Sequence, residues 1–274
     1  MTDGSDQESQ EVLGTEVARE VAQQARLVLG ERVQAAYAIG SLAHGGFVAT
    51  TSDVDVGLIV DGGAMSPQMH RRIVLTTRER CPGALSELLS LHWTDWEHVG
   101  ADSAPGRFRP LDRTDLLRHG RLLMGEDRRG LAVEPARPAR LADITSFTLQ
   151  VLGSTENMSL LRDPAALCDR GHRRASKAVL LPVRLLWHVE TDCLGSHEAA
   201  AAWHRTQGGA EADLVAAALG WRRSGRIQGQ GLDALLRQIQ IPYRRLVEAL
   251  LRHIPNGEAE LRSSLRTLLA QLVA

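Results

Sequence analysis

Two aspartates separated by one residue, Asp53 and Asp55, are the first candidates for chemistry in this sequence. They lie at the start of a largely apolar run that ends at Val60 and has the residue types of a β-strand. Side chains at positions i and i+2 of a strand share one face, so the two carboxylates are expected to lie close together. Neighbouring carboxylates repel unless a proton or a cation lies between them. Hard oxygen ligands with positions left for water and phosphate suit Mg²⁺, and the pair therefore predicts a magnesium site.

A glycine and a serine precede this pair at the end of another short apolar run, Val33 to Ile39. Gly40 permits a sharp exit from a strand, and Ser41 with the following backbone N–H groups would cradle a phosphate at a helix N-terminus. The alternative interpretation is that the two aspartates are solvated and only cap a turn. Two charges on an apolar strand are costly without a partner, which favours the metal site.

The segment from Gly40 to Val56 resembles the signature of the nucleotidyltransferase superfamily related to DNA polymerase β. The resemblance rests on Gly40-Ser41, a glycine at Gly45 or Gly46, and Ser52-Asp-Val-Asp-Val56. It implies that Asp53 and Asp55 are catalytic carboxylates that bind Mg²⁺. It also implies that Gly40, Ser41 and Ser52 belong to the nucleotide-binding loop. The segment Arg118 to Gly125 resembles the helix and glycine turn by which many small members leave the catalytic domain.

The second half of the chain adds to the resemblance. Lys177 to Trp187 and Ser196 to Trp203 are similar to the helical domain of the aminoglycoside (3'')(9) adenylyltransferases. That similarity puts a nucleotide-contacting arginine at Arg184, and Lys177, seven residues earlier on the same helix face, is expected to join it.

This chain departs from that family at two places. The family's downstream lysine falls on His197, and its acid for the cationic aminoglycoside is replaced by Arg173 and Arg174, with Asp169 the nearest acid. The resemblance therefore does not imply aminoglycoside recognition.

A third carboxylate is expected on the strand after the aspartate pair, where relatives use it to deprotonate the acceptor or to bind a second ion. By alignment that position is Ser90, within the predicted strand 88–93. Glu87 is the nearest acid, but strand alternation requires a bulge to bring it to the same face. His92 shares the face of Ser90 and is a candidate general base. Three interpretations stay open: Glu87 is the base, His92 is the base, or neither is.

The pattern of elements predicts an α+β fold, with a small mixed-sheet nucleotidyltransferase domain followed by an all-helical bundle domain. Apolar residues at helical spacing predict helices over 11–29, 66–80 and 116–124, and strands are expected at 33–39, 52–60 and 88–93. Two prolines mark a linker, and only helical patterns follow it. The predicted organisation is a disordered tail at 1–10, the catalytic domain at 11–133, the linker at 134–139 and the helical domain at 140–274.

Composition excludes several classes of protein. The net charge is −1 and the isoelectric point is near 6.8, which disfavours binding to long nucleic acids. The three cysteines are widely spaced, and neither an apolar leader nor a membrane-spanning run is present. These features predict a cytoplasmic protein without a membrane partner, and they leave the oligomeric state open.

The sequence thus predicts a Mg²⁺-dependent enzyme that binds a nucleoside triphosphate and a small-molecule acceptor in a cleft between two domains. It would move a nucleoside monophosphate, AMP from ATP, to a hydroxyl of an acceptor that is antibiotic-like in class. The alternative is a catalytically impaired relative that binds nucleotide or a protein partner without turnover.

Overall fold

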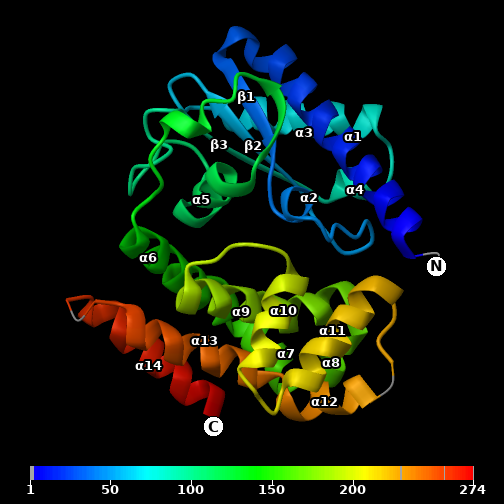
Figure 1. Ribbon diagram of the computed structural model, residues 1–274, viewed down its shortest axis with the longest axis vertical. Coiled ribbons are helices and arrows are strands. Elements are labelled where there is room, and N and C mark those ends of the chain that lie inside the picture. Colours follow the sequence, from blue (N-terminus) through cyan, green and yellow to red (C-terminus); the bar gives the residue numbers. More distant parts are fainter. Residues whose placement is uncertain (1–2, 229, 256, 274) are drawn as a thin grey trace. The chain divides into compact units, whose positions relative to one another are not determined.

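The computed structural model describes residues 3–228, 230–255 and 257–273. The chain divides into two compact units, Met1–Ala136 and Arg137–Ala274. The sequence predicts a linker at 134–139, and a helix, α6 (Arg137–Phe147), begins within that segment. The first unit combines a sheet with helices, and the described part of the second contains helices alone, so the α+β fold class predicted from the sequence is confirmed (Figure 1).

The first unit is built on a mixed four-stranded sheet with the order β3-β2-β1-β4. Strand β1 is antiparallel to both β2 and β4, whereas β2 and β3 are parallel. The elements in chain order are α1 (Asp3–Leu29), a 3-10 turn (Gly30–Arg32), β1 (Val33–Ala38), α2 (Ser41–His44), β2 (Val54–Val60), α3 (Pro67–Arg80), α4 (Ala84–Glu87), β3 (Leu89–Thr94), α5 (Pro110–His119), β4 (Arg121–Gly125) and a 3-10 turn (Arg129–Leu131).

The two faces of this sheet are covered differently. One face packs against α1 and α3, and its core includes the fully buried Val54 and Val56 of β2. On the other face, Ile59 packs with Phe108 and with Leu116 of α5. Because side chains alternate along a strand, Asp55 lies on the α5 face of the sheet.

Two predictions about helix boundaries are wrong. Residues 3–10, expected in a disordered tail, continue α1, and the Gln10 side chain accepts a hydrogen bond from the Ala49 N–H at 2.9 Å. This contact with the loop before β2 holds the N-terminal part of α1 in place. Met1 and Thr2 lie outside the described residues.

The helix expected over 116–124 instead ends at His119. Residues Arg121 to Gly125 form β4, which pairs with β1 at the edge of the sheet. Gly120 separates the two elements, and the free edge of β1 offers backbone partners that a longer helix would have left unpaired.

The second unit is organised around α9 (His172–Thr191), which packs against α10, α11 and α13. Residues 230–253 form two helices, α12 (Gln230–Gln238) and α13 (Gln240–His253), that meet at Ile239. The remaining elements are α6 (Arg137–Phe147), a π-helical turn (Thr148–Leu152), α7 (Thr155–Arg162), α8 (Pro164–Asp169), α10 (His197–Thr206), α11 (Ala212–Ser224), α12 (Gln230–Gln238), α13 (Gln240–His253) and α14 (Ala259–Val273).

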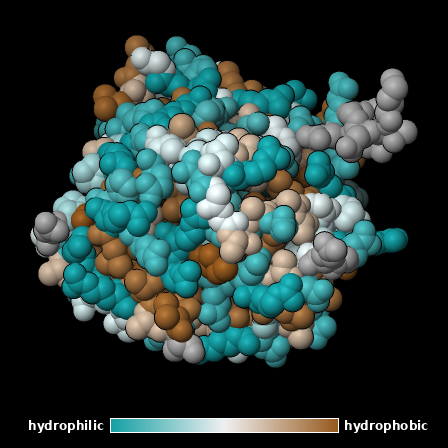
Figure 2. Space-filling model, turned by 60° about the horizontal axis from the view of Figure 1, so that its bottom comes forward, coloured by the Kyte–Doolittle hydropathy of each residue, from teal (hydrophilic) through white to brown (hydrophobic). Residues whose placement is uncertain are grey.

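Among the described residues, no helix has both the length and the apolar character that crossing a membrane requires. On the face drawn in Figure 2, hydrophilic residues predominate and hydrophobic residues occur in small groups between them.

Candidate active site

The two aspartates lie at the beginning of β2. Asp53 immediately precedes the strand and Asp55 is its second residue, and both are partly exposed. Their neighbours Val54 and Val56 are fully buried on the opposite face. Burial alternates at the start of the strand, so the partly exposed Asp55 side chain lies on the α5 face and the two valines lie on the face covered by α1 and α3.

Gly40 brings the backbone of the loop after β1 against Asp55. The Ile39 N–H donates to the Asp55 carbonyl at 3.1 Å, and Gly40 then turns the chain at a φ of 63°. A Cβ at position 40 would lie 2.6 Å from Asp55 Oδ2. A side chain is therefore excluded both by the close approach and by the backbone conformation. Ser41, the first residue of α2, follows directly and is partly exposed.

Ser52 stabilises the loop that leads into the aspartates. Its Oγ accepts a hydrogen bond from the Val48 N–H at 2.9 Å, and its own N–H donates to the Val48 carbonyl at 2.7 Å. The residue is only 4% exposed. This geometry gives Ser52 a role in holding the loop before Asp53, in addition to the nucleotide contact implied by the resemblance.

The parallel pairing of β2 and β3 brings Ser90 and His92 to the aspartates. Ser90 is in register with Asp55, and its Oγ lies 3.0 Å from His92 Nε2. The same nitrogen lies 4.0 Å from Asp55 Oδ1. On the other side of the ring, His92 Nδ1 lies 3.9 Å from Oδ2 of Asp112. His92 is therefore bracketed by two carboxylates.

The surroundings of His92 favour a neutral ring. Burial lowers its pKa, the Asp112 carboxylate acts in the opposite direction, and Arg107 lowers the pKa further. A neutral imidazole has one nitrogen that accepts a proton, as a general base requires.

Glu87 is not brought to the aspartates. It ends α4, its side chain is 63% exposed, and it pairs with Arg78 of α3 at 3.1 Å. Because α3 covers the sheet face opposite to Asp55, this position does not favour Glu87 as the base. No bulge interrupts the register of β3 between Leu89 and Thr94.

Asp112 is a residue that the sequence reasoning missed. It lies in the first turn of α5, which begins with Pro110 at its first position. A proline at the first position and an acid in the first turn are typical of a helix start, and the sequence has both in Pro110 and Asp112. A helix predicted to begin at 116 leaves Asp112 outside any element, although α5 begins at Pro110.

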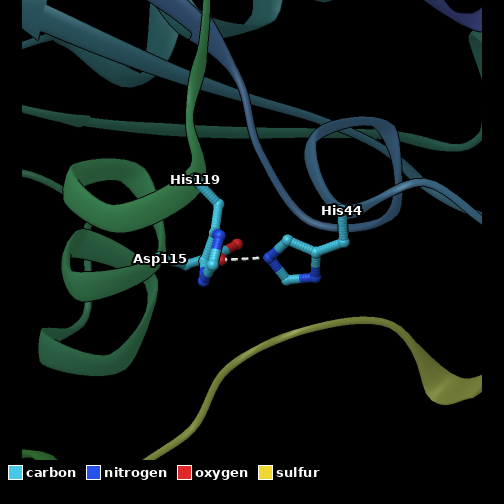
Figure 3. A group of neighbouring side chains, drawn as sticks. All are labelled: His44, Asp115 and His119. Atoms are coloured by element: carbon cyan, nitrogen blue, oxygen red, sulfur yellow. Dashed lines mark hydrogen bonds and ion pairs between the residues drawn. The ribbon is translucent and has the colours of Figure 1, made fainter. Parts of the chain in front are cut away.

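A second group missed from the sequence lies beside Gly40. The Asp115 carboxylate accepts the Gly40 N–H at 2.9 Å through Oδ2 and contacts His44 Nε2 through Oδ1. His44 also packs edge-on against His119, with ring centroids 4.8 Å apart. Figure 3 shows that Asp115 and His119 come from α5 and that His44 comes from α2. The group connects α5 to the loop that carries Gly40 and Ser41.

The remaining predicted residues, Lys177 and Arg184, lie on α9 in the second unit. Lys177 is exposed and Arg184 is partly exposed. Burial lowers the pKa of His197 well below its ordinary value, and the positive charges of Arg184, Arg222 and Lys177 lower it further. The four side chains therefore form a basic cluster in which His197 is neutral.

No family model matches the chain, and no curated protein matches it. Among solved structures, the chain is similar to the crystal structure of spectinomycin adenyltransferase AAD(9) from an Enterococcus species, determined with ATP and spectinomycin. The TM-score is 0.58 at 14% identity, and the match covers 84% of this chain and 98% of that one. At this identity the likeness establishes the fold alone. The chain shares the fold of this adenyltransferase, which is the fold that the resemblance stated from the sequence implies.

Proposed function

We propose that the chain is a Mg²⁺-dependent nucleotidyltransferase that transfers a nucleoside monophosphate, AMP from ATP, to a hydroxyl group of a small molecule and releases pyrophosphate. The observation that carries the proposal is the position of Asp53 and Asp55 at the start of β2, with the Gly40 backbone against Asp55. The fold supports it, because the similar structure of spectinomycin adenyltransferase AAD(9) contains ATP and spectinomycin.

The residues present fit a magnesium ion. Asp53 and Asp55 would supply hard carboxylate oxygens, and the absence of a side chain at Gly40 keeps a Cβ from colliding with the Asp55 carboxylate. When bound, Mg²⁺ would neutralise charge on the phosphates and lower the pKa of the acceptor hydroxyl.

Three further features support nucleotide binding. The backbone of Gly40 and Ser41 would contact the phosphates, with Ser52 keeping the loop in its conformation. Lys177 and Arg184 would contribute positive charge for the triphosphate, because phosphate contacts from cationic side chains are charge-assisted. His197, neutral among these cations, would donate or accept a hydrogen bond without adding charge.

His92 is the general base in this proposal. It is neutral and lies near Asp55, and Asp112 on its other side would orient the ring and stabilise the imidazolium that forms when it takes the proton of the acceptor hydroxyl. Ser90, where relatives have an acid, would accept a hydrogen bond from Nε2 once that nitrogen has taken the proton of the acceptor hydroxyl.

The direct test is an acceptor screen with α-labelled ATP and Mg²⁺, in which label transfer and pyrophosphate release are both measured. We expect equimolar label transfer and pyrophosphate release with at least one hydroxylated acceptor, and neither product with the Asp55→Asn variant. Pyrophosphate formed equally by both proteins would come from a contaminant and would contradict the proposal.

The acceptor is not expected to be a cationic aminoglycoside. Arg173 and Arg174 stand where relatives have the acid for the drug, and Arg174 donates to the Asn157 side chain at 3.3 Å. We therefore expect streptomycin and spectinomycin to be poor substrates or none, although the similar structure contains spectinomycin. Resistance to either drug in a sensitive host that expresses this chain would contradict this expectation.

A second candidate function is nucleotide binding without turnover, in a regulatory or partner-binding role. The observation that favours it is Ser90, a neutral hydroxyl in register with Asp55 where a third carboxylate is expected. The two functions are distinguished by one pair of measurements. If Mg·ATP raises the melting temperature while no acceptor yields pyrophosphate, the binding role is favoured.

A further inference from the structure

His44, Asp115 and His119 form a compact group that the proposed reaction does not use as ligands. Each offers one ligand atom, and these atoms all lie within 4.8 Å of one another. In a tetrahedral zinc site the metal–nitrogen and metal–oxygen bonds are about 2.0–2.2 Å, so the ligand atoms lie roughly 3–3.5 Å apart. Small side-chain adjustments would bring the three atoms to that separation.

The scaffold holds the group in place. Asp115 and His119 are four residues apart on α5 and therefore lie on one helix face. His44 is the last residue of α2, and its N–H donates to the Gly40 carbonyl at 3.0 Å. Figure 3 shows the three side chains pointing toward one another from these two helices. Ligands on rigid elements lose little conformational freedom when an ion binds.

The carboxylate of Asp115 is already oriented. Its Oδ2 accepts the Gly40 N–H at 2.9 Å, which directs Oδ1 toward the two imidazoles. A ligating carboxylate is usually held in this way by a hydrogen bond to its other oxygen.

Burial provides an independent sign. The His44 side chain is only 4% exposed, and its Nε2 is directed at the Asp115 carboxylate. A buried ring held in this orientation is a donor that an ion can use without reorganising the side chain.

We propose that His44, Asp115 and His119 bind a first-row transition-metal ion of the Zn²⁺ class. Two imidazole nitrogens and one carboxylate oxygen suit Zn²⁺, and three protein ligands leave a fourth position for water or a ligand. The site differs in chemistry from the pair Asp53 and Asp55, whose oxygens suit Mg²⁺. Asp115 also accepts a hydrogen bond from the Gly40 N–H, so a bound ion would hold α5 against the loop that joins β1 to α2.

The test is a titration of the chelator-treated full chain with Zn²⁺, in competition with a chromophoric chelator and with excess Mg²⁺ to saturate oxygen sites. We expect one tightly bound Zn²⁺ per chain and roughly a 100-fold or greater loss of affinity in each of the variants His44→Ala and His119→Ala. Co²⁺ should give the strong visible bands of a four-coordinate nitrogen and oxygen site in the wild type alone.

Two control variants make the result specific. His98→Ala removes a histidine that also pairs with an aspartate, Asp95, at 2.7 Å, and should leave Zn²⁺ affinity unchanged. Asp53→Asn should also leave it unchanged, which separates this site from the proposed catalytic one. Two results would overturn the proposal and leave His44 and Asp115 as an ion pair. One is that the chain does not bind one Zn²⁺. The other is that wild type and His119→Ala bind Zn²⁺ with equal affinity and have the same melting temperature.

Discussion

Two carboxylate sites, one in each unit, use charge in opposite ways. In the first, Asp53 and Asp55 stay partly exposed at the start of an apolar strand, with the Asp55 side chain 26% exposed. In the second, Glu211 is 1% exposed and is held by His204 at 3.0 Å and Arg245 at 2.8 Å. A carboxylate that remains accessible on an apolar strand contributes little to stability and is available for chemistry. An enclosed carboxylate with two partners connects helices.

The largest expected effect tests the first half of this contrast. Asp53→Asn and Asp55→Asn should each lower transferase activity by about 1,000-fold or more, because stabilising the charge of the reacting phosphates through a metal is worth several kcal/mol. The melting temperature in metal-free buffer should stay unchanged, since the charges serve the metal and not the core. Activity is measured as pyrophosphate release and stability by circular dichroism.

Either of two results would break the assignment of these aspartates. One is near-normal turnover in either variant. The other is a sharply lower melting temperature in both variants without metal, which would make the pair structural.

The second prediction concerns Glu211, which connects α10, α11 and α13. Glu211→Gln should lower the free energy of unfolding by about 3 kcal/mol, at the lower end of the range for breaking a buried ion pair because Arg245 is 27% exposed. The matched control is Glu248→Gln, whose pair with Arg244 at 3.8 Å is 43% exposed and should contribute less than about 0.5 kcal/mol. Urea unfolding measures both, and equal losses would contradict the contrast.

The effect of Glu211 depends on pH in a defined direction. Burial alone raises its pKa, but hydrogen bonds from His204 and Arg245 outweigh burial and lower the pKa to about 2. Since the folded-state pKa lies below the ordinary value of 4.5, the stabilisation is complete above that pH. The difference between wild type and Glu211→Gln should shrink as the pH falls from about 4.5 to about 2.

The third prediction decides between the two bases left open by the sequence. His92→Ala should reduce turnover by about 100-fold, the lower end of the range for a general base, with ATP affinity unchanged. Glu87→Gln should have little effect, because Glu87 pairs with Arg78 at the α3 side of the sheet. A severe loss in Glu87→Gln alone would assign the base to Glu87, and mild losses in both variants with intact ATP binding would favour the non-catalytic function.

The fold class and the strand that carries Asp55 could be predicted because they depend on local pattern. The apolar residues that alternate with Asp55 predict both the strand and the sheet face on which Asp55 lies. A glycine is required at position 40 because a Cβ there would collide with the Asp55 carboxylate. The boundary of α5 could not be located as easily, because helix and edge strand are both compatible with the segment 116–124. Pairing with β1, a tertiary contact, decides between them.

The groups around the site could not be predicted in the same way. Asp115 and His44 are 71 residues apart, and their contact depends on α5 packing next to the loop after β1. Asp112 reaches His92 for the same reason. No spacing rule in the sequence encodes such contacts, because they arise only when α5 packs next to the loop after β1.

The smallest expected effect concerns the basic cluster of the second unit. Arg184→Ala should weaken ATP binding by about tenfold, because a charge-assisted phosphate contact contributes roughly 1.5–3 kcal/mol. The matched control is Arg223→Ala on α11, which removes the same charge from an exposed position and should leave ATP affinity unchanged. Calorimetry of Mg·ATP binding measures both variants, and equal affinities in all three proteins would make Arg184 a structural residue.

His197 gives this prediction a second readout that does not depend on ATP. Burial is the largest cause of its lowered pKa, and the charge of Arg184 adds to it, so Arg184→Ala should raise the pKa of His197 toward its ordinary value. Arg223→Ala should not change that pKa. A higher His197 pKa together with weaker ATP binding would assign the cluster to the triphosphate. A higher His197 pKa with unchanged ATP affinity would mean that Arg184 acts only on its neighbour His197. This face of α9 would then have no role in nucleotide recognition, and its charges, like Glu211, would serve the structure of the second unit.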